Sequence, residues 1–171
     1  WIVDPLDGTL NFLHGMPHFA VSIALEREGE LVAGVIYNPA TDEMFHAEKG
    51  RGAWLSDRRL RVASRKHFDE AVIATGMPFM GKTGHARFLK ELHQIMPHTA
   101  GVRRMGSVAL DLAWVAAGRY DGFWERNLKP WDIAAGIVLV KEAGGFVSEA
   151  DGGEDILRTG NIAAGNEDML A

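Results

Sequence analysis

The sequence of 171 residues contains no cysteine, which excludes disulfide bridges, thiolate metal sites and thiol catalysis. Long apolar runs are also missing, since none approaches the roughly 20 residues that a membrane-spanning helix needs. Positive charge is scarce, with 18 Lys and Arg against 23 Asp and Glu. Because both signs are spread along the chain, there is no basic stripe of the kind that nucleic acid or an anionic membrane requires. The expected partner is therefore a small molecule, with neither nucleic acid nor membrane as a target.

Apolar residues are plentiful, and their share of 47% can fill the core of one sizeable domain. The chain opens on Trp1, without an initiator Met, in a stretch that reads as a buried strand. We therefore expect a single domain over residues 1–171 whose N-terminal part is missing. The lack of cysteine is compatible with a reducing compartment, and the expected location is the cytoplasm.

The first half of the chain reads mostly as β-structure. Pro5 restricts the residue before it and favours the corner of a turn, so it ends the first strand. Large apolar residues then alternate with small or polar ones, as they do in a half-buried strand. Turn-rich segments between the strands predict an antiparallel meander. The expected strands are residues 1–4, 19–27, 31–38, 43–50 and 71–75.

Helices and strands interleave in the second half. Apolar spacing predicts helices over 85–96 and 107–117, and Pro130 predicts the start of a third helix that Gly144 and Gly145 end. The helix over 107–117 is expected to present one apolar face and to use Gly118 as its C-terminal cap. Short strands are expected at 121–125, at 146–149 and near residue 164. Since the order lacks strict βαβ regularity, the fold class is mixed α+β in layers.

Two aspartates follow the first strand in the run WIVDPLDGTLNF. The residues Asp4, Pro5, Leu6 and Asp7 suit a β-turn, which would fold the two carboxylates toward one point. Two unpaired carboxylates that close repel each other, and one would hold a proton unless a cation sits between them. Carboxylate oxygens, with the carbonyl of Leu6, suit a hard ion such as Mg²⁺.

Gly8 and Thr9 open a short segment, LNFLH, that is expected to form one or two helical turns. Its free backbone N–H groups would point at an incoming anion. A metal pair beside an anion cradle is the geometry of phosphate-ester hydrolysis. A structural alternative stays open, in which Asp7 caps that helix and Asp4 is a turn former.

A third carboxylate, Asp132, lies in the first turn of the helix that Pro130 starts. An acid at this position also favours the helix dipole by about 0.3–1 kcal/mol, so a purely structural role is open here too. Glu125 ends a predicted strand seven residues earlier, and that strand could deliver it to the same place. The alternative for Glu125 is a solvated charge at the rim.

The run WIVDPLDGTLNF resembles a signature of the inositol monophosphatase family, and KPWDIAAG followed by EAGG resembles its second signature. Between them, HGMPHFAVSIAL, GVIYNPATDEMFHAEKGRGAW and RRMGSVALDLAWVAAGRYDGFWE are also similar to the family, so the likeness covers nearly the whole chain. NFLHG is closer to the inositol phosphatase branch than to the nucleotide or histidinol phosphatase branches. The resemblance implies a layered αβαβα sandwich of the inositol monophosphatase and fructose-1,6-bisphosphatase type, usually a homodimer.

The resemblance also implies roles for single residues. The Mg²⁺ ligands would be Asp4, Asp7, Asp132 and the carbonyl of Leu6. The catalytic residues would be Asp4, Asp7, Thr9 and Asp132, with the Thr9 hydroxyl orienting the attacking water. The substrate would be held by Asp7, Gly8, Thr9, Gly106, Ser107, Val108, Glu125 and Asp132. In this set the N–H groups of Gly8 and Thr9 hold the phosphate, and Glu125 accepts hydrogen bonds from sugar or cyclitol hydroxyls.

The implied activity is that of a Mg²⁺-dependent, lithium-sensitive phosphomonoesterase that hydrolyses inositol monophosphate or a related sugar phosphate with metal-activated water. One departure is that family members carry an upstream Glu motif, a further metal ligand, which this chain lacks. A terminal helix after Ala171 would be missing as well. The alternatives are a phosphatase of the same fold for fructose 1,6-bisphosphate, histidinol phosphate or NADP(H), and a catalytically silent homologue that binds a protein.

Residues 76–83, GMPFMGKT, fit the P-loop pattern G-x-x-x-x-G-K-[ST] between a predicted strand and a predicted helix. Phe79 and Met80 are bulky at positions where close approach of the backbone to phosphate favours small residues. Gly84 also weakens the start of the helix, and the phosphatase family has a similar TG-x-P-[FY] run here. A P-loop nucleotide binder is therefore the least favoured alternative.

Overall fold

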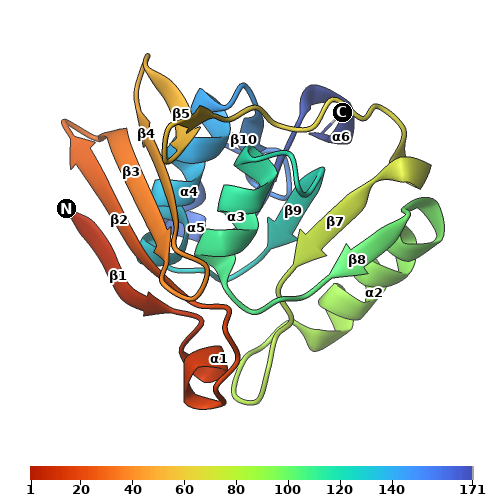
Figure 1. Cartoon of the computed structure of the whole chain (residues 1–171). Helices are drawn as coiled ribbons and strands as arrows, with labels where there is room; N and C mark the ends of the chain where they lie inside the picture. Colours follow the sequence, from red (N-terminus) through yellow and green to blue (C-terminus); the bar gives the residue numbers. More distant parts are fainter. Residues whose placement is uncertain (171) are drawn as a thin grey trace.

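Two β-sheets organise the computed structural model, which describes residues 1–170 (Figure 1). The first is an antiparallel sheet of six strands in sequence order, so the expected meander is confirmed. Its strands are β1 (Ile2–Asp7), β2 (Ala20–Arg27), β3 (Glu30–Asn38), β4 (Glu43–Glu48), β5 (Gly52–Leu55) and β6 (Arg58–Arg59). The second sheet has the order β10-β11-β9-β7-β8. Its strands are β7 (Val72–Thr75), β8 (Gly101–Arg103), β9 (Gly122–Glu125), β10 (Phe146–Ser148) and β11 (Ile162–Gly165).

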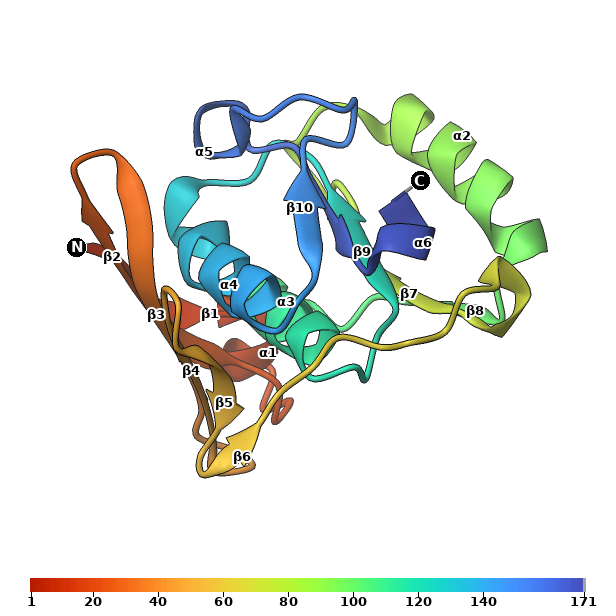
Figure 2. The same ribbon diagram turned by 90° about the horizontal axis from the view of Figure 1, so that it is seen from above.

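Helices lie between the sheets and beyond the second one, as the view from above shows (Figure 2). Helices α3 (Val108–Ala116) and α4 (Pro130–Glu142) form the middle layer. Helices α2 (His85–Ile95) and α6 (Glu167–Leu170) pack on the far face of the second sheet. Two short helices, α1 (Thr9–Leu13) and α5 (Ile156–Thr159), and two 3₁₀ turns, η1 (Phe68–Glu70) and η2 (Met96–His98), complete the elements. Within residues 1–170, no helix is both long and apolar enough to cross a membrane.

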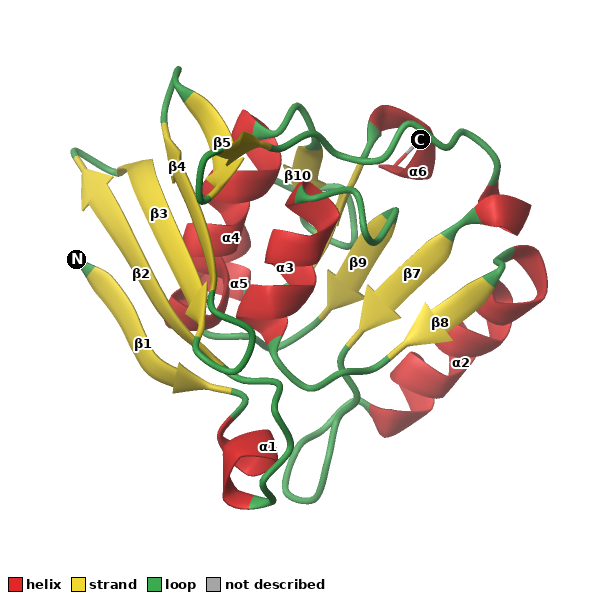
Figure 3. Ribbon diagram, viewed as in Figure 1, coloured by secondary structure: helices red, strands yellow, loops and turns green. Residues whose placement is uncertain are grey.

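The layers therefore run sheet, helix, sheet, helix (Figure 3). This arrangement confirms the mixed α+β class. Of the five layers of the expected αβαβα sandwich, the described residues form four. The helical layer on the outer face of the six-stranded sheet is not formed by residues 1–170.

The middle helices are buried nearly all round, so the expectation of one apolar face for residues 107–117 was too narrow. In α3 the buried residues are Ala109, Leu110, Asp111, Leu112, Ala113, Val115 and Ala116. A helix that lies between two sheets must be apolar on both sides. Two glycines allow close packing. A Cβ at Gly34 in β3 would lie 2.7 Å from the Ala135 carbonyl oxygen of α4, and one at Gly136 in α4 would lie 2.5 Å from the Leu112 side chain of the neighbouring α3.

Close packing also decides which face of β2 is buried. Ala20, Ser22 and Ala24 are at most 1% exposed and belong to the side facing the middle helices. The larger Val21, Ile23 and Leu25 alternate with them and are only half-buried. The small residues of the alternating pattern therefore face the core, because α4 lies too near for large ones.

Several element boundaries differ from those expected. The strand expected over 43–50 ends at Glu48, and α2 ends at Ile95, with Pro97 inside the 3₁₀ turn that follows. The short strands β5, β6 and β8 were not predicted. The helix ends were predicted more closely: Ser107 is the N-cap of α3, Pro130 begins α4, and Gly118 has a positive φ of 69° just after the end of α3.

The β-turn predicted for residues 4–7 is wrong, because β1 continues through Asp7. Asp4 pairs with Ser22 and Asp7 with Ala20, so three steps along β1 match two steps along β2. The extra residue is a β-bulge, and the Leu6 N–H donates to Asp4 Oδ1 at 3.0 Å within it. In a regular strand, residues three apart point to opposite faces. The bulge instead lets both aspartates pair with residues on the same, helix-facing side of β2.

Candidate active site

Three aspartates converge where β1 ends and α4 begins. Asp4 and Asp7 come from β1, and Asp132 comes from the first turn of α4. One carboxylate oxygen from each lies within 4.8 Å of the others. Oxygens bound to one Mg²⁺ are at most about 4.2 Å apart. Small side-chain rotations therefore allow the three groups to share a hard cation.

Asp7 is fixed to the start of α3 rather than to α1. Its Oδ2 accepts hydrogen bonds from the Ser107 hydroxyl and from the Ala109 N–H at 2.9 Å. The N-cap of α1 is Gly8, without a side-chain hydrogen bond, so the alternative in which Asp7 caps that helix is wrong. Asp7 is 8% exposed. Burial raises the pKa of its carboxyl to about 6; the hydrogen bond from Ser107 opposes the rise, and the charges of Asp4 and Asp132 add to it.

The bulge also orients Leu6 and Thr9. The Thr9 hydroxyl donates to the Leu6 carbonyl oxygen at 2.8 Å. A carbonyl oxygen has two lone pairs, so the Leu6 carbonyl keeps one for a further donor or a cation. Gly8 has a left-handed φ of 77°, and a Cβ there would lie 3.0 Å from the His18 carbonyl oxygen. Glycine is therefore required at the step from β1 into α1.

Asp132 has a structural role as well as a place among the three acids. Its Oδ2 accepts the Lys129 N–H at 2.7 Å, which completes a capping box at the start of α4. Its Oδ1 makes no hydrogen bond within residues 1–170. Burial raises the pKa of the Asp132 carboxyl, and the Asp4 charge raises it further. The capping interpretation and the metal-ligand interpretation are thus compatible, since each needs one oxygen.

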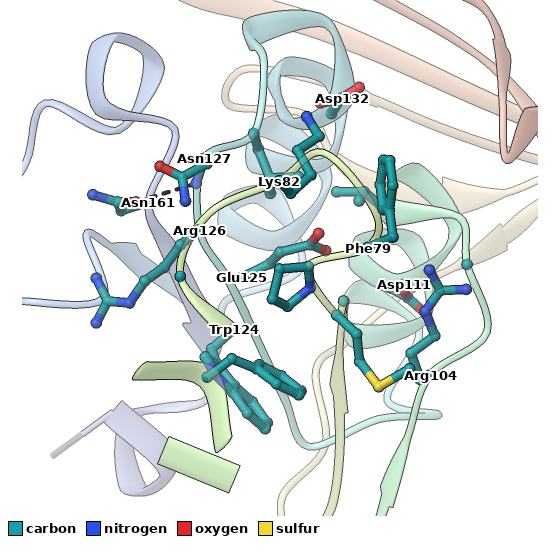
Figure 4. Close-up of a pocket in the computed structure, with 18 of the residues that line it drawn as sticks. Phe79, Lys82, Arg104, Asp111, Trp124, Glu125, Arg126, Asn127, Asp132 and Asn161 are labelled. Atoms are coloured by element: carbon teal, nitrogen blue, oxygen red, sulfur yellow. Dashed lines mark hydrogen bonds between the residues drawn. The ribbon is translucent and has the colours of Figure 1, made fainter. Parts of the chain in front are cut away.

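A cavity of about 520 Å³ adjoins the three acids through Asp132, which lines it (Figure 4). Five of the residues that the sequence predicted for the site line it: Gly106, Ser107, Val108, Glu125 and Asp132. The other five lie outside its lining, at the acidic edge: Asp4, Leu6, Asp7, Gly8 and Thr9. Asp132 lines the cavity and is also one of the three converging acids. The cavity and the three acids are therefore one site.

Glu125 lies inside the cavity and is not a solvated rim charge. Its Oε2 is buried and has no hydrogen-bond partner among the described residues. Burial raises the pKa of its carboxyl to about 8, against the lowering effect of the Arg104 charge. The site needs glycine at position 76, because a Cβ there would lie 2.0 Å from the Glu125 carboxyl carbon.

Sequence reasoning missed other residues of the lining, notably Arg104 and Asp111. Asp111 could have been found, because an acid inside the apolar run VALDLAWVA is unusual in a buried helix. No pattern pointed to Arg104. Lys82, which the sequence placed in the P-loop alternative, lies on the loop between β7 and α2 and lines the same cavity (Figure 4). Its charge lowers the pKa of Glu125 and Asp132.

Comparison with known proteins agrees with this geometry. The sequence matches the model of the inositol monophosphatase family over residues 1–171. It is 64% identical over 167 residues to an inositol-1-monophosphatase of Mesorhizobium japonicum, covering 98% of this chain and 63% of that protein. It is 51% identical over 168 residues to a protein of Pseudomonas aeruginosa named Nus factor SuhB, covering 97% of this chain and 62% of that one.

Among solved structures, extragenic suppressor protein suhB from Bartonella henselae superposes with a TM-score of 0.95 at 61% identity. The match covers 97% of this chain and 65% of that chain. The chain thus spans about 63% of the length of the curated relatives that it matches.

Proposed function

The chain belongs to the inositol monophosphatase family, and from that premise we propose that the whole protein is a Mg²⁺-dependent phosphomonoesterase. Its substrate is inositol monophosphate or a related sugar phosphate. The observation that carries the proposal is the convergence of Asp4, Asp7 and Asp132, within 4.8 Å of one another, beside a cavity that contains a buried Glu125. In the same proposal the protein is a lithium-sensitive homodimer of the cytoplasm.

The three aspartates fit a hard cation. Each uses one oxygen in a hydrogen bond to the protein, namely Asp4 Oδ1, Asp7 Oδ2 and Asp132 Oδ2, and keeps the other. Among residues 1–170, no Lys or Arg forms an ion pair with any of them. Three acids without an ion-pair partner among these residues favour a divalent metal, and the Leu6 carbonyl adds a fourth oxygen. Bound Mg²⁺ would screen the phosphoryl oxygens and lower the pKa of a water.

The chain's own residues would position the reactants. Because the Thr9 hydroxyl gives its hydrogen to Leu6, its oxygen is free to accept a hydrogen from the attacking water and so orients it. The N–H groups of Gly8 and Thr9 would hold the phosphate at the start of α1. Glu125, across the cavity, would accept hydrogen bonds from the hydroxyls of the substrate. The direct attack by water needs no covalent intermediate on the protein.

The proposed activity is tested with the full-length protein on a panel of phosphate esters. Inositol 1-phosphate is expected to release phosphate only when Mg²⁺ is present, and faster than fructose 1,6-bisphosphate, histidinol phosphate and NADP. A phosphate-release assay with and without EDTA measures this. Release that is equal in EDTA would reject metal dependence, and a faster rate on another ester would reassign the substrate.

Mg²⁺ binding is expected to weaken in acid. A carboxyl whose pKa is raised to about 6, as that of Asp7 is, holds its proton below pH 6, and the metal must displace that proton. Between pH 7.5 and pH 5.0 the affinity should therefore fall about tenfold, from the competition of one proton. Calorimetric titration at the two pH values measures this change. An affinity that rises or stays constant toward pH 5.0 would contradict a ligand role for Asp7.

A second candidate is a catalytically silent homologue that binds a protein partner. It is favoured by the relatives named Nus factor SuhB, a name that denotes no enzyme activity. The same Mg²⁺ titration separates the two candidates. The phosphatase should show saturable Mg²⁺ binding in the wild type, and the Asp4→Asn and Asp7→Asn variants should lose it. A silent scaffold should show no such binding.

A further inference from the structure

Asp111 is a buried carboxyl group without a hydrogen bond. It lies in α3, is 2% exposed, and its Oδ1 has no partner among the described residues. Leaving such a group buried and unpaired destabilises a fold, because its hydration is lost and no hydrogen bond replaces it. None of the hydrogen bonds or ion pairs formed by residues 1–170 involves its side chain. No contact among the described residues therefore explains this carboxyl group as a contribution to the stability of the fold.

The position of Asp111 points to the ligand cavity. Its side chain lines the same cavity as Glu125, with Arg104 beside both (Figure 4). Burial raises the pKa of Asp111 well above its usual range. The charge of Glu125 adds to the rise, and the charge of Arg104 opposes it. Glu125 also has an oxygen without a partner. Two carboxyl groups with unused oxygens thus line one cavity.

The chemistry of this pair selects among ligands. A hydroxyl group both donates and accepts, so neighbouring hydroxyls on a carbon skeleton satisfy two carboxyl groups whichever of them holds a proton. An apolar ring would leave both acids unpaired. A second phosphate beside this pair would meet two acids, and like charges repel. Of the three arginines that line the cavity, Arg87 and Arg126 are paired with Glu91 and Asp151, which leaves Arg104, with Lys82 on the loop before α2.

We propose that Asp111 is a specificity-determining residue, which with Glu125 binds the hydroxyl groups of a polyol that carries a single phosphate. This inference rests on the proposed phosphatase function and deepens it. It assigns the recognition of the substrate's carbon skeleton to α3 as well as to β9. The reacting phosphate stays with the three aspartates at the other end of the site.

Steady-state kinetics of the full-length Asp111→Asn variant test the assignment. With inositol 1-phosphate, kcat/KM is expected to fall about tenfold or more, mostly through KM, because the amide places an NH₂ donor where the carboxyl group has an acceptor oxygen. With p-nitrophenyl phosphate, which has no polyol, the loss should stay below about threefold. Asp57→Asn, an exposed acid outside the cavity lining, is the matched control. Equal losses on both esters would overturn the proposal.

Stability gives a second, independent test. Replacing an unpaired buried acid by an apolar residue of similar size removes a desolvation cost, so Asp111→Leu should raise the midpoint of thermal unfolding in the absence of ligand. A residue with a merely structural role would lower it. A lower midpoint for Asp111→Leu would therefore overturn the proposal.

Calorimetric binding of inositol 1-phosphate, with Ca²⁺ in place of Mg²⁺, separates failure of the inference from failure of the phosphatase function. If the wild type hydrolyses neither ester, the proposed function fails, and binding alone decides the inference. Binding at least about tenfold weaker in Asp111→Asn would uphold it. Equal binding by the two proteins, or no binding by the wild type, would reject it.

Discussion

Asp132→Asn is expected to abolish Mg²⁺-dependent phosphate release, with kcat about a thousandfold below that of the wild type. A catalytic metal contributes several kcal/mol to the barrier, and each 1.36 kcal/mol is about tenfold in rate. The substitution removes one of three negative charges that lie within 4.8 Å of one another. The amide oxygen can still accept the Lys129 N–H that caps α4, so the fold should survive. Phosphate release and calorimetric Mg²⁺ titration measure the two consequences.

The control for this variant is Asp155→Asn, an exposed acid before α5. It should keep wild-type turnover and wild-type Mg²⁺ affinity. In EDTA, the midpoints of thermal unfolding of both variants should lie close to that of the wild type. This result would show that the loss of activity in Asp132→Asn is not caused by a loss of structure. Undiminished turnover by Asp132→Asn would reject the metal assignment.

Asp121→Ala is expected to cause the largest loss of stability. The Asp121 side chain is fully buried and accepts the Val72 N–H at 2.8 Å and the Arg65 guanidinium at 2.6 Å. These bonds join the start of β9 to β7 and to the segment that crosses from the first sheet to the second. Removing the acceptor leaves the Val72 N–H without its partner and takes from Arg65 the buried end of an ion pair, which should cost about 3 kcal/mol. For a chain of this size the unfolding midpoint should fall by about 6–12 °C.

A surface pair provides the comparison for Asp121. Asp155 pairs with Arg158, and both side chains are more than half exposed. Exposed pairs three residues apart on a helix add little, because water screens them. The urea midpoint of Asp155→Ala should therefore equal that of the wild type within experimental error. A midpoint for Asp121→Ala that matches that of Asp155→Ala would contradict the buried role of Asp121.

Local patterns predicted the long elements and some of the short strands, but missed the short strands β5, β6 and β8. The alternation in β2 and β3, the turns between strands, and the proline that begins α4 all act within a few residues, so they can be read from the sequence. The strands β6 and β8 have only two and three residues. They exist because of partners far along the chain, such as the parallel pairing of Gly101 with Val72. No local signal encodes such a pairing.

For the candidate site as well, part could be predicted from local sequence and part could not. The acids Asp4, Asp7 and Asp132 could be proposed from their positions next to a strand end and in the first turn of a helix, and from the family resemblance. The way in which they meet could not be proposed correctly. A turn was expected between Asp4 and Asp7, whereas a bulge set by pairing with Ser22 and Ala20 brings them together.

Residue types and their spacing determined by themselves the fold class, the main helices and strands, and the acidic residues of the site. Only the tertiary structure decided that Asp7 is held by the start of α3, that the small residues of β2 face inward, and that Asp111 and Glu125 share one cavity. The physical reason is the range of the forces. Backbone preferences and apolar periodicity act between near neighbours in sequence, but burial, desolvation and charge repulsion depend on which distant segments are packed together.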